Sequence, residues 1–235
     1  MKYARFLAVS PRIGVVSKIA AKEEVGPEKG RKAAYFARNR AALILATQNL
    51  LGEKGWNATI EEVAANAGVS VSTIYQHFDT KDELFRSCFI EAWTAFETWA
   101  LESSASIEDP LERLVAPMRL MFRGATIHPT LAKMLVRNQA EVTLLVPIFT
   151  KNLGNAMRAL VKAKVLDVDH ADVRITNLKA VLMQTFVIQL ENPKSSPNDS
   201  DFALSLALPM IGIPAAKAKE ITTCPLATDT TKRIA

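Results

Sequence analysis

The residues with the most evident chemistry lie between positions 70 and 81, where short polar side chains follow one another closely. Hydroxyl, phenol and imidazole groups at this spacing can hydrogen-bond to phosphate oxygens or base edges, and a valine can contact a thymine methyl group. A lysine at the end of the segment can neutralise a phosphate. The residues concerned are Val71, Ser72, Thr73, Tyr75, His77 and Lys81. Their chemistry is that of nucleic-acid binding rather than of covalent catalysis.

Groups that would support catalysis or bind a metal do not form a known motif. The histidines His77, His128 and His170 lie in separate segments, and no glycine-rich phosphate loop or Ser-His-Asp arrangement occurs. The cluster D-V-D-H-A-D brings carboxylates together but lacks the glycine of a calcium loop, which favours a polar connector that caps the following helix. The sequence therefore predicts no enzyme, no metal and no cofactor.

Helices must position the polar segment, and capping residues predict where those helices begin and end. Thr59 and Glu62 form a capping box, so a helix should begin at Ile60 with its apolar residues on one face. Gly68 is suited to end this helix in a left-handed conformation, and Ser70 caps the next helix. Two short helices joined by a tight turn form a helix-turn-helix.

A third helix should follow directly, because Thr80 and Glu83 form a second capping box ahead of it. Its apolar residues continue from Leu84 to about Ser103, so it should connect the motif to the rest of the chain. Periodicity predicts further helices at 110–126, 130–137, 142–164, 172–191 and 199–213. The predicted fold class is all-α.

The run A-G-V-S-V-S-T-I-Y-Q-H-F-D-T-K-D-E-L resembles the DNA-binding signature of the TetR (tetracycline repressor) family of bacterial transcriptional regulators. The resemblance extends from about Arg38 to Phe89, with Ile44, Ala46 and Gly55 in familiar places. It implies an N-terminal three-helix helix-turn-helix DNA-binding domain and a larger C-terminal helical domain for ligand binding and dimerisation. In this family the ligand-bound form usually leaves the operator.

Carried over position by position, the resemblance assigns DNA contacts in and beside the second helix of the motif. The predicted contacts are Val71, Ser72 and Thr73 toward bases, Tyr75, His77 and Lys81 toward phosphates, and Thr59. Two such helices reach half-sites about one helical turn of DNA apart (~34 Å) only if a dimer holds them at that spacing. The long helix from Lys81 would transmit the effect of a ligand to this spacing.

The positive charge of the chain is concentrated in its N-terminal third. Residues 1–81 hold 12 Lys and Arg against 7 Asp and Glu, whereas residues 82–235 hold 17 of each. Basic side chains that neutralise phosphates release counterions, which favours nucleic acid, although basic tails also solubilise proteins. The sequence predicts four segments: a basic N-terminal extension at 1–31, a DNA-binding domain at 32–82, a ligand-binding and dimerisation domain at 83–213, and a loose tail at 214–235. The extension is either a disordered arm that contacts DNA or a solvated tail.

Cysteine usage and hydropathy predict a cytoplasmic protein. Cys88 and Cys224 are far apart and form no Cys-x-x-Cys motif, which is typical of a reduced compartment. Cys88 lies among apolar residues and should pack in the core. The apolar run near the N-terminus is too short for a signal peptide, and no stretch approaches the ~18 apolar residues of a membrane span.

Methionine and aromatic residues along the C-terminal helices would furnish an apolar interior. Such side chains can adapt a pocket to varied guests, although the same pattern more often belongs to an ordinary core. Arg123 and Gln184 could orient a polar group of the ligand, or equally face solvent or a dimer partner. The candidate ligand contacts are Trp93, Met118, Met121, Met134, Phe149, Met157, Met183 and Phe186.

The last two predicted helices, 172–191 and 199–213, are too apolar to be one-sided surface helices. This favours a symmetric four-helix contact between two copies of the chain. The leading hypothesis is a homodimeric repressor that a small, mostly apolar ligand releases from a palindromic operator. Two alternatives stay open: a DNA-binding activator or architectural protein without a small-molecule inducer, and a helical hydrolase or metal-binding module.

Overall fold

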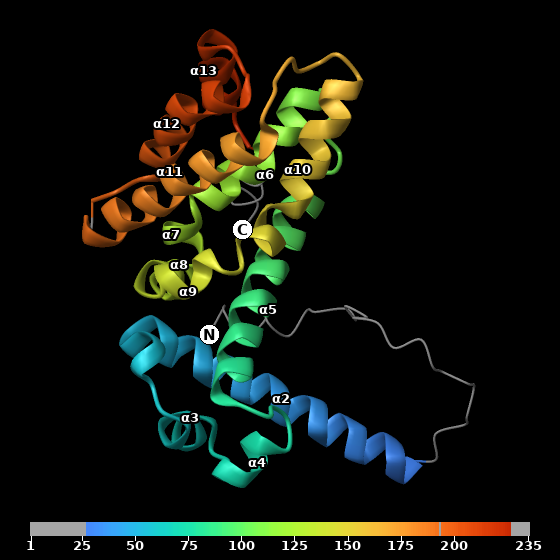
Figure 1. Cartoon of the computed structure of the whole chain (residues 1–235), viewed down its shortest axis with the longest axis vertical. Coiled ribbons are helices and arrows are strands. Elements are labelled where there is room, and N and C mark those ends of the chain that lie inside the picture. Colours follow the sequence, from blue (N-terminus) through green and yellow to red (C-terminus); the bar gives the residue numbers. More distant parts are fainter. Residues whose placement is uncertain (1–26, 193, 227–235) are drawn as a thin grey trace, which may run out of the picture. The chain divides into compact units, whose positions relative to one another are not determined.

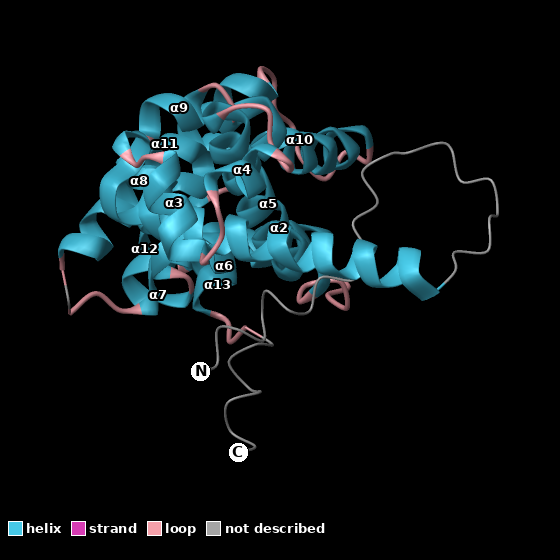
Figure 2. Ribbon diagram, turned by 90° about the horizontal axis from the view of Figure 1, so that it is seen from below, coloured by secondary structure: helices cyan, strands magenta, loops and turns pink. Residues whose placement is uncertain are grey.

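The computed structural model describes residues 27–192 and 194–226, with the side chains of 27–34 and 146–149 outside the description. Throughout these ranges the regular secondary structure is helical and contains no strand (Figure 2). The predicted all-α fold class is therefore confirmed. No helix in the described part of the chain is both long and apolar enough to cross a membrane.

The chain divides into two compact units, residues 1–42 and 43–235. The described part of the first unit is the start of helix α2 (Pro27–Lys54), where the guanidinium carbon of Arg38 lies 5.4 Å from the Tyr35 ring centroid. Proline is favoured at a first helical position, because its missing N–H has no helical acceptor there. The helix thus begins inside the predicted extension 1–31, most of which lies outside the described residues.

The second unit contains the predicted helix-turn-helix, with its main caps formed (Figure 1). After the short helix η1 (Gly55–Asn57), α3 (Ile60–Ala67) begins at a complete capping box. Thr59 Oγ1 accepts the Glu62 amide at 3.2 Å, and the Glu62 carboxylate accepts the Thr59 amide at 3.0 Å. Gly68 ends α3 at a φ of 67°, a left-handed conformation that glycine adopts without steric cost. Ser70 caps α4 (Val71–Tyr75) as predicted.

Two local details differ from the prediction. The spacing of Ile74 and Phe78, four residues apart, predicts that both lie on the inward face of the second helix. Helix α4 ends at Tyr75, so Phe78 lies beyond it in the following turn, although its ring is still buried in the core. The capping box ahead of α5 (Lys81–Glu102) is incomplete. Thr80 Oγ1 accepts the Glu83 amide at 3.0 Å, but the Glu83 carboxylate accepts the amide of Asp79, at 2.7 Å. The path of the turn brings the earlier amide within reach of the carboxylate.

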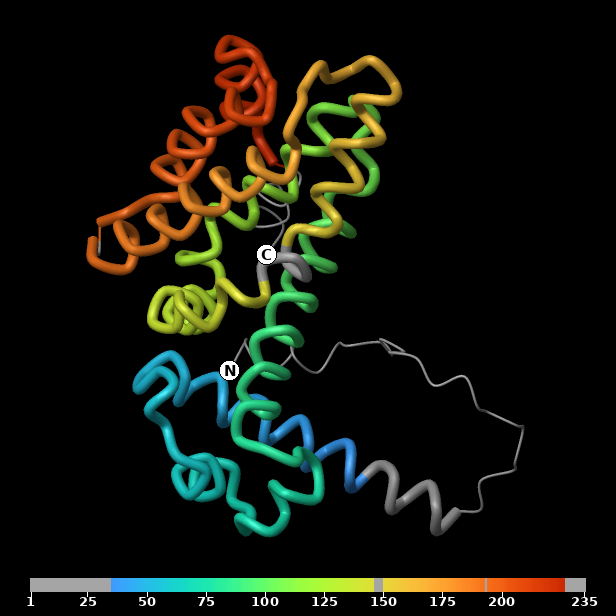
Figure 3. The backbone as a smooth tube through the Cα atoms, viewed as in Figure 1, coloured from blue at the N-terminus to red at the C-terminus, as the bar shows by residue number. Residues whose placement is uncertain are grey.

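The C-terminal helices follow α5, which runs from the helix-turn-helix into their midst (Figure 3). They are α6 (Pro110–Phe122), α7 (Gly124–Ile127), α8 (Pro129–Arg137), α9 (Gln139–Thr143), α10 (Val146–Lys162), α11 (Ala171–Glu191), α12 (Pro197–Ala207), η2 (Leu208–Ile211) and α13 (Ala215–Thr223). Three predicted helices are interrupted: 110–126 at Arg123, 142–164 just before Pro147, and 199–213 beside Pro209. Proline lacks the amide that would continue a helix, which accounts for the last two breaks.

The predicted loose tail at 214–235 is wrong for its first part, because α13 occupies Ala215–Thr223. Ala218, Ile221 and Thr222 are buried, and α13 packs against α12 and α6. Their spacing of three and four residues places them on one helical face, a signal that was present in the sequence. Arg119 Nη1 of α6 also donates to the carbonyl oxygens of Ile221 at 3.2 Å and Cys224 at 2.7 Å.

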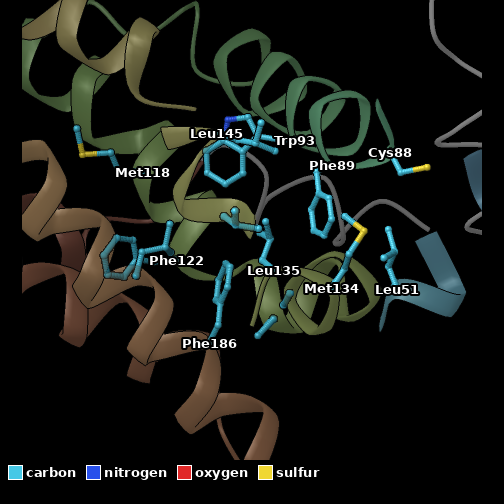
Figure 4. Packing of buried hydrophobic residues seen from close by; sticks show 14 of the residues in the cluster. Leu51, Cys88, Phe89, Trp93, Met118, Phe122, Met134, Leu135, Leu145 and Phe186 are labelled. Carbon is cyan, nitrogen blue, oxygen red and sulfur yellow. The ribbon is translucent and has the colours of Figure 1, made fainter. Parts of the chain in front are cut away.

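One large hydrophobic cluster extends from the helix-turn-helix into the C-terminal helices. Leu51 of α2, Phe89 of α5 and Met134 of α8 lie together on one side of the close-up, and Phe186 of α11 lies further along (Figure 4). Cys88 is fully buried in this cluster, as predicted, and its thiol lies 3.8 Å from the carbonyl oxygen of Ile44. The shared cluster packs the DNA-binding motif directly on the C-terminal helices.

Candidate nucleic-acid interface and ligand cavity

Three hydroxyl groups gather at the start of α4, where the sequence predicts base contacts. Ser70 Oγ lies 2.8 Å from Ser72 Oγ and 2.9 Å from Thr73 Oγ1, and it accepts the Thr73 amide at 3.2 Å. Ser70 therefore has two functions, since it caps the helix and orients both neighbouring hydroxyls. All three residues are partly or well exposed, so the cluster can exchange hydrogen bonds with an external partner.

The other predicted DNA contacts differ in how freely they can reach a partner. Tyr75, at the end of α4, is 51% exposed, and His77 is partly exposed in the turn that follows. Val71 packs partly against the hydrophobic cluster, which limits the methyl contact predicted for it. Thr59 caps α3 and retains a hydroxyl hydrogen for an external acceptor.

Lys81 has an internal partner that the sequence did not indicate. Its ammonium donates to the carbonyl oxygen of Trp56 at 2.9 Å and lies 5.0 Å from the centroid of the Phe85 ring. Trp56 Nε1 in turn donates to Asp82 at 3.2 Å, which joins η1 to the start of α5. An ammonium has three donors, so Lys81 can still reach a phosphate while it helps to hold the motif.

The polar connector around His170 is organised differently from the prediction. His170 precedes α11 in a left-handed conformation, and no side chain caps that helix. The Asp169 carboxylate instead accepts a hydrogen bond from Arg174 Nη2 at 3.0 Å. Across the described residues, no group of three His, Cys, Asp or Glu side chains is placed to hold a metal.

A cavity of about 130 Å³ lies among the C-terminal helices. Helices α5, α6, α8, α9, α10 and α11 all contribute to its wall, which is mostly apolar. Trp93, Met118, Met121 and Met183, four of the candidate ligand contacts, line it. The prediction of an apolar space among these helices thus has a physical counterpart.

Three of the remaining candidate contacts do not line this cavity. Met134, Met157 and Phe186 are buried in the hydrophobic cluster, and the side chain of Phe149 lies outside the described residues. The ring of Phe186 is wedged against Gly124, where an added Cβ would meet it at 2.9 Å. Helical periodicity places a residue on an inward face but does not distinguish a cavity wall from solid packing.

The cavity wall also holds polar residues that the sequence analysis missed. Glu97 of α5 is 8% exposed, and burial raises the pKa of its carboxyl to about 7, while a hydrogen bond with the Asn152 side chain opposes the rise. Lys179 of α11 lines the same space, and burial lowers the pKa of its ammonium. Glu97 follows Trp93 by four residues on one helical face, which is the signal that could have revealed it.

Arg123 and Gln184 do not have the role considered for them at the ligand. Arg123 Nη2 lies 2.6 Å from Asp201 of α12, and Arg119 Nη2 lies 2.7 Å from the same carboxylate. All three groups are buried, so this cluster ties α6 to α12. Gln184 is exposed on α11 and does not line the cavity.

Comparison with known families accounts for both parts of this arrangement. A family model described as "Bacterial regulatory proteins, tetR family" matches residues 43–88. A second, described as "Tetracyclin repressor-like, C-terminal domain", matches residues 109–224. The chain belongs to the TetR family. It is therefore a DNA-binding transcriptional regulator of the repressor type, with the helix-turn-helix in the first matched segment.

Individual members of the TetR family resemble the chain over most of its length. The HTH-type transcriptional regulator BetI of Rhizobium meliloti (strain 1021) is 27% identical over 178 residues, which is 71% of this chain and 84% of that protein. RolR in complex with resorcinol superposes with a TM-score of 0.65 at 21% identity, covering 83% of this chain and 97% of its own. The fatty acid degradation regulator FadR of Bacillus halodurans gives 0.61 at 16% identity, covering 81% and 97%. At these identities the two structures establish the fold alone.

Proposed function

We propose that the chain is a homodimeric repressor that binds a palindromic operator through α4 and leaves it when a small, mostly apolar ligand enters the cavity. The observation that carries this proposal is a connection between the cavity wall and the end of α2, the helix on which the motif is built. The cavity-lining residues Leu135 and Val142 lie on either side of Asn138 in the chain, and Asn138 bonds directly to α2.

The Asn138 contact offers a route by which a ligand can act on DNA binding. Its amide donates to the carbonyl oxygen of Leu51 at 3.1 Å and to that of Met134 at 2.6 Å. Leu51 lies in the last turn of α2, where backbone carbonyl oxygens have no N–H donor within the helix. A ligand that shifts α8 and α9 would therefore also shift the end of α2 on which the motif is built.

A second route is α5 itself, as the sequence analysis expects. Trp93, Glu97 and Leu101 of α5 line the cavity, whereas its first residue, Lys81, holds the Trp56 carbonyl beside the motif. Because a helix is stiff, displacement at the cavity end would tilt the other end. The tilt would alter the spacing of two recognition helices relative to two half-sites.

An exposed apolar face supports the homodimer. Phe202 and Leu206, one turn apart on α12, are 65% and 63% exposed, and Ile188 near the end of α11 is 55% exposed. Large apolar side chains in this number on two neighbouring helices would be buried by a second copy related by two-fold symmetry. The proposed interface of α11 and α12 thus has exposed apolar residues that a second copy could bury.

The operator is tested by selecting bound sequences from a random duplex pool at near-physiological salt. We expect an inverted repeat, and Tyr75→Phe should weaken binding to it by about 5- to 100-fold, the usual effect of losing one good DNA contact. Thr223→Val, which alters an exposed hydroxyl on α13, is the matched control and should bind normally. Recovery of no sequence, or of one without symmetry, would contradict the proposal.

Dimerisation is tested separately by analytical ultracentrifugation of Phe202→Glu/Leu206→Glu. We expect monomers with reduced operator affinity, whereas Leu144→Glu, at an apolar residue 71% exposed between α9 and α10, should remain dimeric. A ligand requirement is tested by screening small apolar compounds for release of the operator. An activator or architectural protein without an inducer would bind the same site, and no compound would change that binding.

A further inference from the structure

Two charged groups of opposite sign line the cavity without forming an ion pair with each other. Glu97 extends from α5 and is almost wholly buried, and Lys179 extends from α11 and is partly buried. Within the described residues, Glu97 has the Asn152 side chain as its hydrogen-bond partner, and Lys179 has no salt-bridge partner. Burying a charged group without a partner of opposite charge is unfavourable.

The rest of the cavity wall restricts which ligands could bind beside these two charged groups and stabilise them. Trp93, Met118, Met121, Leu178 and Leu182 surround the two charges with apolar surface. A purely apolar guest would leave both charges unpaired and further desolvated. A simple amine would satisfy the carboxylate but oppose the ammonium, and a simple acid would do the reverse.

We propose that the cavity selects a small bifunctional ligand, namely a one-ring apolar body that carries a hydrogen-bond donor directed at Glu97 and an acidic group directed at Lys179. The inference rests on the proposed function in assigning this cavity as the ligand site. The volume limits the apolar body to one ring, because an apolar cavity of about 150 Å³ accommodates benzene and this cavity is of about 130 Å³. Arg113 of α6, also on the wall, adds a second positive charge for the acidic group.

The titration of both groups supports the same ligand class. Burial raises the pKa of Glu97 to about 7 and lowers that of Lys179, so the empty cavity disfavours both charged forms. A ligand that donates to Glu97 and accepts from Lys179 stabilises both charged forms at once. Binding at neutral pH should therefore release protons from Glu97, since its carboxyl is then partly protonated.

The test compares ring compounds with both, one or neither of the two groups, by calorimetry on the full chain. The bifunctional probes are 3- and 4-hydroxybenzoate and 4-aminobenzoate, with benzoate as the acid alone, benzyl alcohol as the donor alone and toluene as neither. We expect a bifunctional probe to bind about 10- to 100-fold tighter than either single-group probe, as one charge-assisted hydrogen bond supplies. Repeating the titration in buffers of different ionisation enthalpy measures the proton release.

Two variants assign each end of the ligand. Glu97→Gln should reduce hydroxybenzoate affinity to that of benzoate and abolish proton release. Lys179→Met should reduce hydroxybenzoate affinity toward that of benzyl alcohol, with Arg113 as the remaining positive charge on the wall. Glu102→Gln on α5 and Lys162→Met on α10, which change exposed charges outside the cavity, should leave all affinities unchanged. Thermal unfolding of each variant establishes that it folds.

Equal affinity of benzoate, benzyl alcohol and the bifunctional probes would overturn the inference, and so would the failure of every probe to bind. An operator-release assay separates these outcomes from the proposed function. Tight bifunctional binding that leaves the operator complex intact would retain the inference and refute induction by ligand. Release of the operator by a compound without either polar group would retain induction and refute the inference.

Discussion

The helix-turn-helix and the C-terminal helices differ in the chain distance between their interacting polar groups. In the motif, Thr59 bonds to Glu62 and Ser70 to Thr73, three residues apart and within reach of water. In the C-terminal region, Arg119 of α6 bonds to Asp201 of α12, 82 residues away and buried. Local exposed contacts define where helices begin, whereas distant buried ones define how helices pack. Removing one such contact should therefore lower the free energy of unfolding much more in the C-terminal region than in the motif.

The largest effect is expected at Asp201, which neutralises two buried arginines. Asp201→Asn would leave Arg119 and Arg123 without their carboxylate and should lower the free energy of unfolding by about 3–5 kcal/mol. Urea denaturation measures the change. The control is Asp169→Asn, which disrupts the more exposed contact with Arg174 and should cost far less, because solvent screens an exposed ion pair. Similar losses for the two variants would remove the contrast between the regions.

The next largest effect is the change of folding stability with pH that Glu97 contributes. Its pKa is about 7 in the folded protein and 4.5 in its unperturbed state, so the folded state holds the proton more tightly. This group therefore lowers stability as pH rises from 4.5 to about 7, and the penalty persists above that range. Arg113 and Lys179 are the other titratable groups on the cavity wall.

Glu97→Gln should remove this contribution. Relative to the unmodified protein, the variant should gain about 2 kcal/mol of stability between pH 5 and pH 8. Chemical denaturation at the two pH values measures the gain, with Glu102→Gln on the exposed part of α5 as the control. A difference that is independent of pH would show that Glu97 titrates normally.

A smaller effect is expected where the two regions meet. Asn138→Ala removes the donor to the Leu51 carbonyl and should lower stability by about 1.5 kcal/mol, because a buried acceptor is left unsatisfied. It should also reduce the effect of a releasing ligand on operator affinity more than it reduces operator affinity itself. Asn155→Ala, at an exposed residue of α10, provides the control. If the ligand changes operator affinity as strongly in this variant as in the unmodified protein, the effect of the ligand reaches the motif through α5 alone.

The smallest effect is expected at the first cap of the motif. Thr59→Ala removes one side of the capping box and should cost about 1 kcal/mol, the usual value for an N-cap. Thr143→Ala on α9, whose hydroxyl donates to a carbonyl within its own helix, serves as a comparison and should cost less. Thermal denaturation measures both. A loss at Thr59 as large as that at Asp201 would mean that the motif is not organised locally.

The parts that could be predicted follow from this difference in chain distance. The starts of α3 and α4 were predictable because Thr59, Gly68 and Ser70 act on amides within a few residues. The connecting role of α5 followed from its long apolar pattern. Interruptions near Pro147 and Pro209 were predictable, because proline lacks the amide that continues a helix, whereas the helix after Pro214 was missed although its regular apolar spacing was visible.

The candidate site divides in the same way. Predicted contacts such as Thr73 and Tyr75 lie on a short helix that carries them to the surface, whereas Lys81 proved to bind the Trp56 carbonyl as well. In the cavity, Met118 and Met183 were predicted but Glu97 and Lys179 were not. No pattern within one helix shows that α5 and α11 converge on one space.

By itself, the sequence determined the helical class, the helix-turn-helix and the residues that its second helix presents. These depend on backbone capping and helical periodicity, which act over three to seven residues. Only the tertiary structure decided that Arg123 binds Asp201, that Met134 packs in the core while Met121 lines a cavity, and that Asn138 holds the end of α2. These outcomes depend on which distant helix faces pack together, and the local pattern of residues does not encode that choice.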